Sequence, residues 1–366
     1  MAEHREWNGR RRPTIRDVAA RAGVSKSLVS LVMRGEPAVR EDKRQRVFEA
    51  AEELGYPVPG TSRSQPVARP GSVGVLVADL RNPLLIDVLE KAGSVLEDAG
   101  LRMLLISAPT TSRGPSGRLD VRAIDALRDL RVEALLVVGS VPDRATLAAT
   151  AGHLPVVVAA ANAEGMHVDV VRNDDHLGMR LVVDYLVARG HRAIAHLGGL
   201  GGGTALERLA SYRAAMEHHG LTSEIVVADA DFTEDAGYRG TAQLLRQERR
   251  ITAITAVNDL AAVGALSAAA DAGLRVPDDL AVTGYDDTFV AAIRQVSLTS
   301  VNPDSAGIGT LAARCLLRRM ADPGRDVEEH LLPPRLVMRF SSDSPLLSTG
   351  RAAQPGAHAD DAQQGS

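Results

Sequence analysis

The sequence contains a single cysteine, Cys315, so an internal disulfide is excluded. No apolar run approaches the roughly 20 residues that a membrane-spanning helix needs. The first segment, MAEHREWNGRRRP, lacks the apolar core of a secretory signal peptide. These absences predict a cytoplasmic protein that neither crosses a membrane nor depends on disulfides.

Charge is distributed unevenly along the 366 residues. Residues 1–70 hold 14 Lys and Arg against 9 Asp and Glu, whereas the remainder holds 28 against 37. A basic head on an acidic body favours a nucleic-acid reader with a separate ligand-binding region, and a solvated basic tail is the alternative. With 45% hydrophobic and 24% charged residues, the chain is typical of a globular protein of two or three domains.

The segment from residue 14 to residue 34 has the pattern of two short helices joined by a sharp turn. Thr14 and Asp17 resemble a capping box, and apolar residues then recur at helical spacing until Gly23 interrupts them. Glycine can adopt the left-handed backbone that a sharp turn needs, and Ser25 is placed to cap the second helix.

A third helix is expected over Glu41–Leu54, with Val47, Ala50, Ala51 and Leu54 facing inward. Gly55 ends this helix and Pro57 prevents its resumption. Two helices joined through a glycine turn and followed by a third predict a helix-turn-helix domain over residues 14–58. A generic three-helix bundle is the alternative.

Residues 14–58, TIRDVAARAGVSKSLVSLVMRGEPAVREDKRQRVFEAAEELGYPV, resemble the start of the LacI/GalR family of transcriptional regulators nearly end to end. The resemblance implies that the second helix enters the DNA major groove, with Lys26, Ser27 and Leu31 facing base edges. Leu31 stands where the family usually has arginine, so apolar contact, for example with a thymine methyl group, replaces bidentate reading of guanine. Arg34 could contact phosphate. The DNA-binding positions carried over are Thr14, Ser25, Lys26, Ser27, Ser30, Leu31 and Arg34.

The linker over residues 59–71, PGTSRSQPVARPG, stands where the family has a hinge helix with a leucine wedged into the minor groove. By ungapped count the wedge position is Gln65, and Pro66 follows it. Proline removes a helical donor and disfavours helix in the residue before it. A flexible linker and a hinge helix therefore both stay open.

From Val73 onward, short apolar runs alternate with helical stretches, which predicts parallel sheets with right-handed crossovers. Strands are expected at Val73–Val77, Arg102–Ser107, Ala134–Val138, Pro155–Ala159, Ile194–Leu197, Ile225–Val227, Ala253–Val257 and Ala281–Gly284. Helices are expected at residues 84–99, 176–189, 205–219, 234–247 and 260–272.

The resemblance continues to about residue 345 through VGVLVADLRNPLL, RLASYRAAM, AVNDLAAVGAL, VTGYDDT and LTSVNPD. It implies a small all-α helix-turn-helix head joined to an α/β body like the periplasmic sugar-binding proteins, with two doubly wound parallel-sheet lobes. The implied N-lobe covers residues 72–171 and 303–331, and the C-lobe covers residues 172–302 and 332–345. Residues 1–13 are expected to be a disordered arm and residues 346–366 a disordered tail.

Candidate ligand residues follow the predicted strands, because ligands of such sheets bind at the carboxyl ends of strands. They are Asn82, Arg208, Phe232, Asn258 and Asp286. Carboxylate, amide and guanidinium groups suit a polyhydroxyl or anionic ligand. The alternative is that polar residues at these places cap helices, and Asp259 is expected to be such a cap. By the resemblance, Arg208, Asn258 and Asp286 match effector-contacting positions, and Phe232 matches an aromatic that stacks on the ligand.

Two departures from the family pattern change the N-lobe side of the cleft. Ala160 and Ala161 stand where an Asp-Arg pair is common, and Leu84 and Leu85 stand where two aromatics are common. The cleft thus loses a charge pair and stacking surface. A sugar or related metabolite, a smaller or more apolar effector, and no effector at all stay open.

The predicted function is that of a transcriptional repressor, a homodimer that binds a double-stranded DNA operator and is controlled by a small molecule. No enzymatic activity, cofactor or metal is expected. The alternatives are a DNA-binding regulator without an effector and a ligand-binding enzyme. Little in the sequence favours the enzyme alternative. The loop Gly198–Gly203 lacks the lysine of a nucleotide-binding loop. The pair His218-His219 is expected to be solvated, and Cys315 is expected to pack in the core. Replacing Arg208 or Asp286 is expected to abolish the effector response without disturbing folding.

Overall fold

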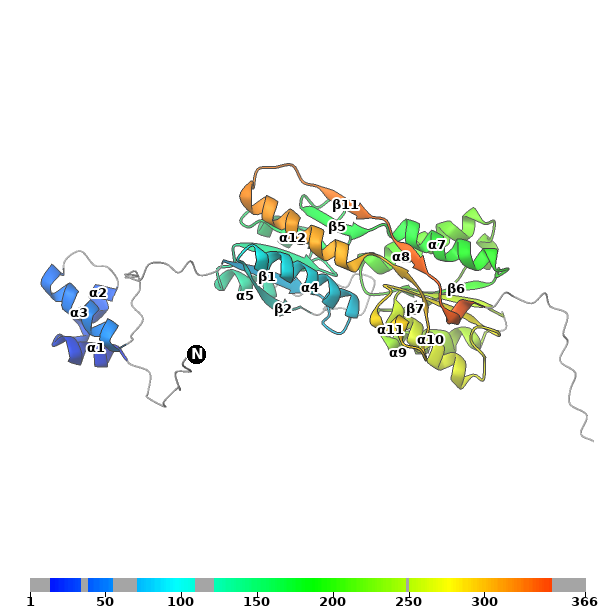
Figure 1. The fold of residues 1–366 in the computed structure, drawn as a ribbon, viewed down its shortest axis with the longest axis horizontal. Helices are drawn as coiled ribbons and strands as arrows, with labels where there is room; N and C mark the ends of the chain where they lie inside the picture. The colour runs from blue at the N-terminus through cyan, green and yellow to red at the C-terminus, as the bar shows by residue number, and fades with distance from the viewer. Residues whose placement is uncertain (1–13, 34–38, 55–70, 109–121, 248–249, 344–366) are drawn as a thin grey trace, which may run out of the picture. The chain divides into compact units, whose positions relative to one another are not determined.

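The computed structural model describes residues 14–33, 39–54, 71–108, 122–247 and 250–343. The chain divides into two compact units, a head within residues 1–69 and a body within residues 70–366, which are described separately (Figure 1). The predicted N-terminal arm, Arg34, the hinge residues Gln65 and Pro66, and the predicted C-terminal tail lie outside the described residues.

The head consists of three helices around a small apolar core, as the sequence predicts. The helices are α1 (Ile15–Ala22), α2 (Lys26–Met33) and α3 (Glu41–Leu54). Val18, Val29 and Val47, one from each helix, are fully or almost fully buried. Gly23 joins α1 to α2 with a φ of +61°, so the predicted left-handed turn is confirmed.

Side chains at both predicted helix starts in the head bond to backbone. The backbone N–H and the hydroxyl of Thr14 donate to the carboxylate of Asp17 at 2.6 and 2.7 Å. The hydroxyl of Ser25 accepts a hydrogen bond from the backbone N–H of Leu28 at 3.3 Å. These bonds satisfy groups that the first turn of a helix leaves unpaired, and they fix where α1 and α2 begin.

In the described part of the body, the strands form two six-stranded sheets, one in each lobe. The N-lobe strands are β1 (Ser72–Val77), β2 (Arg102–Ser107), β3 (Ala134–Val138), β4 (Val156–Ala159), β5 (Asp169–Asn173) and β11 (Glu329–Leu332). The C-lobe strands are β6 (Ile194–Gly199), β7 (Val226–Ala230), β8 (Ala253–Ala256), β9 (Ala281–Tyr285), β10 (Thr299–Asn302) and β12 (Arg335–Val337).

The sheets are almost entirely parallel. The N-lobe order is β11-β5-β4-β3-β1-β2, with every neighbouring pair parallel. The C-lobe order is β12-β10-β9-β8-β6-β7, in which the edge pair β10–β12 is antiparallel and the others are parallel. The predicted parallel sheets are confirmed.

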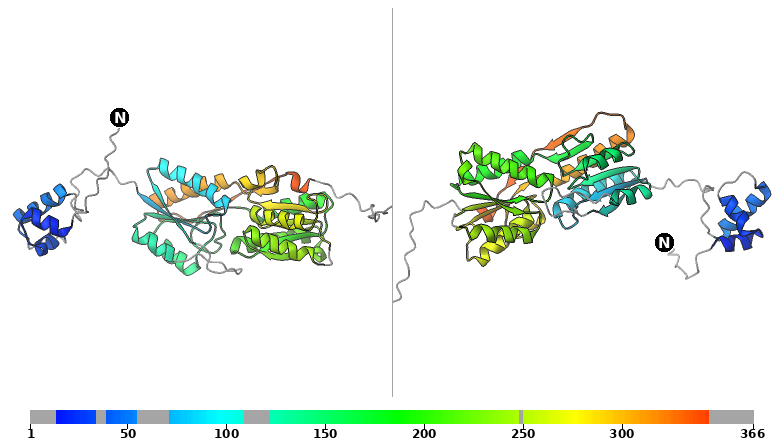
Figure 2. Two further views of the ribbon diagram at one scale, coloured as in Figure 1. Left: turned by 90° about the horizontal axis from the view of Figure 1, so that it is seen from below. Right: turned by 180° about the vertical axis from the view of Figure 1, so that it is seen from behind.

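Helices cover both faces of each sheet (Figures 1 and 2). In the N-lobe, α4 (Pro83–Asp98) and α12 (Ser305–Ala321) pack on one face, and α5 (Arg122–Asp129) and α6 (Arg144–Ala151) pack on the other. In the C-lobe, α9 (Glu234–Leu245) and α10 (Asp259–Asp271) lie opposite α7 (Asp175–Ala188) and α8 (Gly203–His218). The short helix α11 (Phe289–Ala292) and two 3-10 turns, Thr222–Glu224 and Phe340–Ser342, complete the C-lobe. The fold class is the predicted one.

The chain passes between the lobes three times, between β5 and α7, between β10 and α12, and between β11 and β12. All eight predicted strands and all five predicted body helices are present, with ends shifted by a few residues. The sequence did not predict β5, β10, β11 or β12, because these strands are short and carry polar residues.

Candidate functional site

One cavity of about 470 Å³ lies between the two lobes of the body. Residues that end or directly follow β1, β3, β4 and β5 line it from the N-lobe, and residues after β6, β7 and β9 line it from the C-lobe. This position is the one expected of a ligand site in open parallel sheets, where the carboxyl ends of strands meet.

Four of the five predicted effector residues line this cavity, namely Asn82 from the N-lobe and Arg208, Phe232 and Asp286 from the C-lobe. Asn82 is also the N-cap of α4, where its Oδ1 accepts from the backbone N–H of Leu84 at 3.1 Å. A single asparagine can thus both begin a helix and present its amide N–H₂ to a ligand.

Asn258, the fifth predicted residue, is not among the cavity-lining residues. It is the N-cap of α10, where its Oδ1 accepts from the backbone N–H of Ala261 at 2.9 Å. Its Nδ2 donates to the carbonyl of Phe232 at 3.2 Å. Asn258 therefore supports the segment that carries Phe232.

Arg208 is almost fully buried, at 2% exposure, beside the cavity. Its Nε donates to Asp175 at 2.8 Å, and its Nη1 donates to Asp286 at 3.2 Å and to the carbonyl of Val257 at 2.5 Å. The guanidinium lies 3.6 Å from the ring centroid of Tyr285, which it covers. Its Nη2 has no hydrogen-bond partner among the described residues.

Asp286, which accepts from Nη1 of this guanidinium, also lines the cavity. It directly follows β9 with a φ of +104°, a backbone conformation that non-glycine residues rarely adopt. Burial raises the pKa of Asp286 to about 7, although the Arg208 guanidinium opposes that shift. A carboxyl group with this pKa exists in both forms near neutral pH, so it can donate or accept a hydrogen bond.

The expectation that Asp259 caps a helix is wrong, because the cap is Asn258 and Asp259 is the first residue of α10. The Asp259 carboxylate points away from the helix and accepts from the backbone N–H and hydroxyl of Thr288 at 2.7 and 2.9 Å. It also accepts from the hydroxyl of Ser300 at 2.5 Å, and burial raises its pKa to about 6. Asp259 thus anchors the segment that follows Asp286.

The remaining walls of the cavity differ in chemistry. Leu84, Leu85 and Ala160 give the N-lobe side an apolar surface, as their sequence positions suggested. At the rim, charged residues are already paired with each other, Asp79 with Arg81 and Asp235 with Arg239.

Asn173, which ends β5 and lines the cavity, was not predicted as a site residue. Its Nδ2 donates to Asp175 at 3.0 Å and to the hydroxyl of Tyr285 at 2.8 Å, so it belongs to the same polar cluster as Arg208. The strand-end rule would have identified Asn173 if β5 had been predicted.

The glycine-rich segment Gly198–Gly203 contributes to the cavity wall. Gly201 lines the cavity with a φ of +104°. A Cβ atom there would lie 3.0 Å from the ring of Phe232, so only glycine fits without displacing the ring. The loop therefore shapes the cavity wall beneath Phe232.

In the head, α2 presents a polar face and one leucine to solvent. Lys26 and Ser27 are exposed, and Leu31 is 36% exposed, whereas Val29 and Val32 face the core. Of the other predicted DNA-binding residues, Thr14 and Ser25 cap α1 and α2, Ser30 is half-buried, and Arg34 lies outside the described residues.

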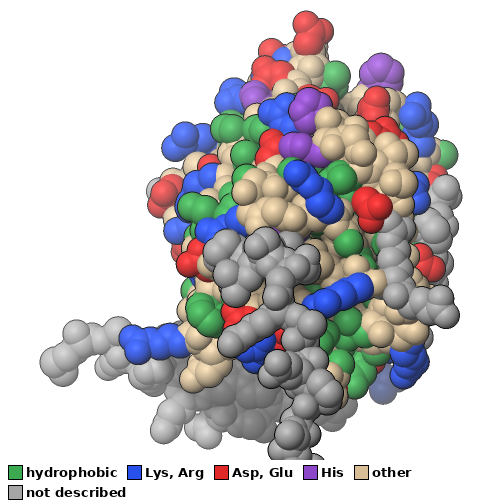
Figure 3. All heavy atoms as spheres, turned by 90° about the vertical axis from the view of Figure 1, so that its right-hand side faces the viewer, with side chains coloured by type: hydrophobic (Ala, Val, Ile, Leu, Met, Phe, Trp, Pro, Cys, Tyr) green, Lys and Arg blue, Asp and Glu red, His purple; other side chains and the backbone are tan. Residues whose placement is uncertain are grey.

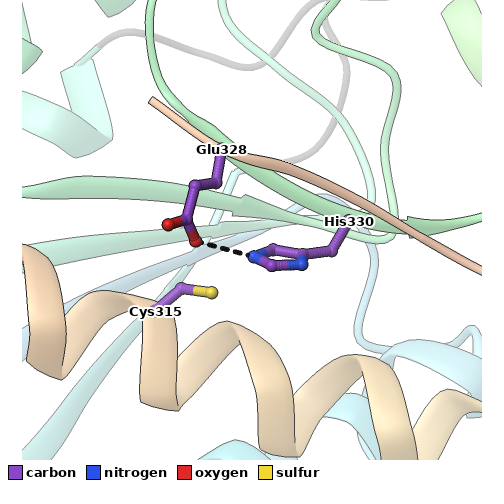
Figure 4. Close-up of side chains that lie close together, drawn as sticks. All are labelled: Cys315, Glu328 and His330. Carbon is purple, nitrogen blue, oxygen red and sulfur yellow. Dashed lines mark hydrogen bonds and ion pairs between the residues drawn. The ribbon is translucent and has the colours of Figure 1, made fainter. Parts of the chain in front are cut away.

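Three groups of metal-ligand type, Cys315, Glu328 and His330, lie with their ligand atoms within 4.8 Å of one another (Figure 4). Glu328 is bonded to His330 at 2.9 Å and to Arg325. Arg318 donates to Glu328 at 3.2 Å and to the Cys315 sulfur at 3.1 Å. Two guanidinium groups therefore already supply positive charge there, and we interpret the cluster as an ion-pair network that joins α12 to β11.

The adjacent histidines His218 and His219 lie at the end of α8. His218 is exposed, and His219 bonds to Asp184 on α7 at 2.6 Å. Figure 3 shows histidine side chains on this end of the C-lobe among interspersed acidic and basic residues. Within the described residues, no helix is both long and apolar enough to span a membrane.

Comparison with known proteins gives matches for both units. A family model described as bacterial regulatory proteins, lacI family, matches residues 14–58, and one described as a periplasmic binding protein-like domain matches residues 183–342. The HTH-type transcriptional repressor PurR of Proteus mirabilis is 32% identical over 344 residues, which cover 92% of this chain and 99% of that protein.

Two solved structures are similar over nearly the whole chain. The lac repressor dimer bound to operator and the anti-inducer ONPF is 25% identical with a TM-score of 0.66, covering 91% of this chain and 99% of that one. The complex of the transcriptional regulator CelR with cellobiose is 27% identical with a TM-score of 0.63, covering 90% and 100%.

Proposed function

The chain belongs to the LacI family of bacterial regulatory proteins, and we propose that it is a repressor whose operator affinity is set by a small molecule bound between its lobes. The observation that carries this proposal is the cavity beside Arg208, where a buried guanidinium keeps one nitrogen unpaired. A ligand oxygen that accepts from this nitrogen would gain a charge-assisted hydrogen bond in a largely desolvated site.

The distribution of hydrogen-bonding groups describes the ligand. Arg208, Asp286 and Thr204 line the C-lobe side. The N-lobe side combines the apolar Leu84 and Leu85 with polar residues such as Asn82. We infer a ligand with hydroxyl groups along one edge and an apolar face on the other, as in a sugar or its aryl or alkyl glycoside. The Phe232 ring offers an apolar surface for a sugar face.

The charge around Arg208 favours a neutral ligand. Asp175 and Asp286 both bond to this one guanidinium, so its positive charge is already compensated. A phosphate or carboxylate on the ligand would lie near the carboxyl group of Asp286, which lines the cavity, and its ionised form would repel the ligand. Neutral sugars are therefore expected to bind better than their phosphorylated forms.

For the head, we propose that α2 lies in the major groove with Lys26, Ser27 and Leu31 toward base edges. Ser30 and the cap residues Thr14 and Ser25, together with Arg34, are the further proposed DNA contacts. Leu31 can contribute apolar contact with a thymine methyl group but no bidentate bond to guanine.

We propose a homodimer that mirrors a near-palindromic operator, because helix-turn-helix units bind paired half-sites. Among the large apolar residues of the C-lobe that are exposed, Phe289, Ile293, Met338 and Phe340 belong to two segments and are 41–71% exposed. Their segments are hydrogen bonded to each other through Ser297, which accepts from the Phe340 backbone. Exposed large apolar side chains of this kind suit burial against a second copy, which light scattering would detect as twice the chain mass.

The test of the proposed function has two steps. An operator is first selected from random DNA by the full-length protein. Thermal shift is then measured with cellobiose, other neutral mono- and disaccharides, aryl glycosides and sugar phosphates, because a ligand of the native state raises the melting temperature. A neutral compound that stabilises the protein and changes operator affinity supports the proposal, and failure to select any DNA sequence would refute it.

A further inference from the structure

Outside the cavity, a second set of polar contacts joins the two lobes. The Glu207 carboxylate on α8 of the C-lobe accepts from Arg172 Nη1 on β5 of the N-lobe at 2.8 Å. It also accepts from Asn162 Nδ2, in the loop after β4, at 2.8 Å. Arg172 Nε in turn donates to Glu329 on β11 at 2.9 Å. We call Asn162, Arg172 and Glu207 the interlobe clamp.

The clamp is largely shielded from water. The side chains of Arg172 and Glu207 are 13% and 11% exposed, and both carboxylate oxygens of Glu207 are bonded to the N-lobe. Exposed ion pairs contribute little, but breaking a buried one by removing one partner leaves an uncompensated charge. The clamp therefore favours the arrangement of the lobes in which it is formed.

Each charged residue of the clamp is the chain neighbour of a residue that lines the cavity. Arg172 precedes Asn173 on β5, and Glu207 precedes Arg208 on α8. Asn173 and Arg208 both donate to the same oxygen of Asp175, at 3.0 and 2.8 Å. A movement of α8 that adjusts Arg208 to a ligand must therefore also move Glu207 relative to β5.

The start of α8 contacts the N-lobe along the same face. A Cβ atom on Gly203 would lie 3.9 Å from the Cβ of Asn162, and Thr204 lines the cavity. Residues 203 and 207 share one face of a helix because they are four positions apart. The first turns of α8 thus carry ligand-binding and lobe-binding groups side by side.

We propose that Glu207 is a positioning residue that couples occupancy of the cavity to the arrangement of the lobes. The clamp is formed in one arrangement, and displacement of α8 from the N-lobe breaks both bonds to Glu207. A ligand that binds the two arrangements unequally shifts their ratio, which is the requirement for control of a distant site. The link to operator affinity rests on the proposed function, whereas the coupling of lobes to cavity does not.

The test measures the distance between lobes in the full-length protein by single-molecule fluorescence energy transfer. Dyes are attached at Asp129→Cys on α5 and Glu217→Cys on α8, two exposed positions, in a Cys315→Ala background. Labelled chains are diluted into unlabelled protein so that each assembly carries one labelled copy. The variants are Glu207→Gln, Arg172→Gln and the double variant.

The matched control is Asp169→Asn, which breaks the buried pair between Asp169 and Arg319, 2.9 Å apart. Both residues lie in the N-lobe, on β5 and α12. This variant should lower the melting temperature and leave the distance distribution unchanged. It separates a loss of stability from a loss of coupling.

In Glu207→Gln, the population of the clamped arrangement should fall at least about fivefold, the lower range of measured couplings between sites. The effect of the double variant should be smaller than the sum of the two single effects, because the bond between Arg172 and Glu207 is lost in all three variants. If Glu207→Gln does not fold, Asn162→Ala can replace it. This loop substitution removes the bond from Asn162 to Glu207 and should also lower the population of the clamped arrangement. An unchanged distance distribution overturns the clamp, whereas loss of operator selection overturns only the proposed function.

Discussion

Replacing Arg208 with alanine tests how the charges beside the cavity are balanced. The sequence alone suggested that this change would leave folding intact, but in the structure the guanidinium is the partner of Asp175 and Asp286. Both carboxylates are at most 4% exposed, so removing the guanidinium leaves two buried carboxylates without their charged partner. The variant should therefore lose stability as well as any response to an effector.

The magnitude follows from the burial of the cluster. Removing one partner of a buried ion pair costs about 3–5 kcal/mol. At roughly 2 °C per kcal/mol for a large domain, the melting temperature of the Arg208→Ala variant should fall by roughly 6–10 °C near pH 7–8. The loss of stability in Arg208→Ala should appear in the unfolding of the body, because the head forms a separate compact unit.

The loss should depend on pH in a defined direction. The pKa of Asp286 is already raised to about 7 by burial, and Arg208 is the group that lowers it, so its removal raises the pKa further. A carboxyl group with a raised pKa in the folded state favours folding at low pH, and this stability is lost as pH rises from about 4 through the folded-state pKa. The part of the deficit that comes from Asp286 should therefore be absent near pH 5 and grow above pH 7, where the wild-type carboxyl group ionises beside Arg208.

The assay is thermal unfolding of the wild type, Arg208→Ala and the control Asp286→Asn between pH 5 and pH 8. In the control, Arg208 keeps its 2.8 Å bond to Asp175 and its bond to the carbonyl of Val257, so the loss should be small. If Arg208→Ala melts like the wild type at pH 8, the Arg208 guanidinium does not stabilise the fold by compensating the two buried carboxylates.

Three further predictions concern other parts of the chain. His196→Phe should raise the melting temperature, because the ring nitrogens of the buried His196 have no hydrogen-bond partner among the described residues. The gain should increase below pH 6.5, since burial lowers the pKa of His196 to about 3 and an unfolded chain takes up the proton first. Equal melting temperatures of the two proteins at pH 5 would contradict this. Leu31→Arg should shift the motif selected from random DNA toward guanine, with about 1–3 kcal/mol of discrimination; an identical motif would reject the docking of α2. Gln65→Leu with Pro66→Arg should tighten operator binding and introduce a bend in circular-permutation gels, where the unmodified protein should bend DNA little; a sharp bend by the unmodified protein would refute the prediction from its prolines.

The elements that sequence could predict are those with a strong local signal. The short apolar runs VGVLV and ALLVV predict buried strands, and both are buried strands in the structure. By contrast, β10 is TSVN and β12 is RLV, too short for any periodicity to show. Their strand conformation comes from pairing with β9 and with each other, which local sequence does not contain.

The sequence allowed the positions of several site residues to be predicted, but not the residues to which they are bonded. Arg208 and Asp286 follow strands or loops where ligand groups are expected, and both line the cavity. Asp175 and Glu207 gave no such signal, because their importance comes from contacts across 33 and 35 residues of chain. The error at Asp259 has a different cause, since a helix start misplaced by one residue exchanges the cap with its neighbour.

The two walls of the cavity divide the work of recognition between the lobes. Polar groups of the C-lobe, above all Arg208 and Asp286, are fixed by buried bonds, and hydrogen bonds are directional. The N-lobe adds the apolar side chains of Leu84 and Leu85 beside the amide of Asn82. Burial of apolar surface contributes about 25 cal/mol per Å² whatever the orientation of the surface. Substitutions on the C-lobe side should therefore change which ligands bind. Substitutions of the leucines should instead change how strongly a bound ligand draws the lobes together, because the free energy of apolar burial depends on the area that is buried.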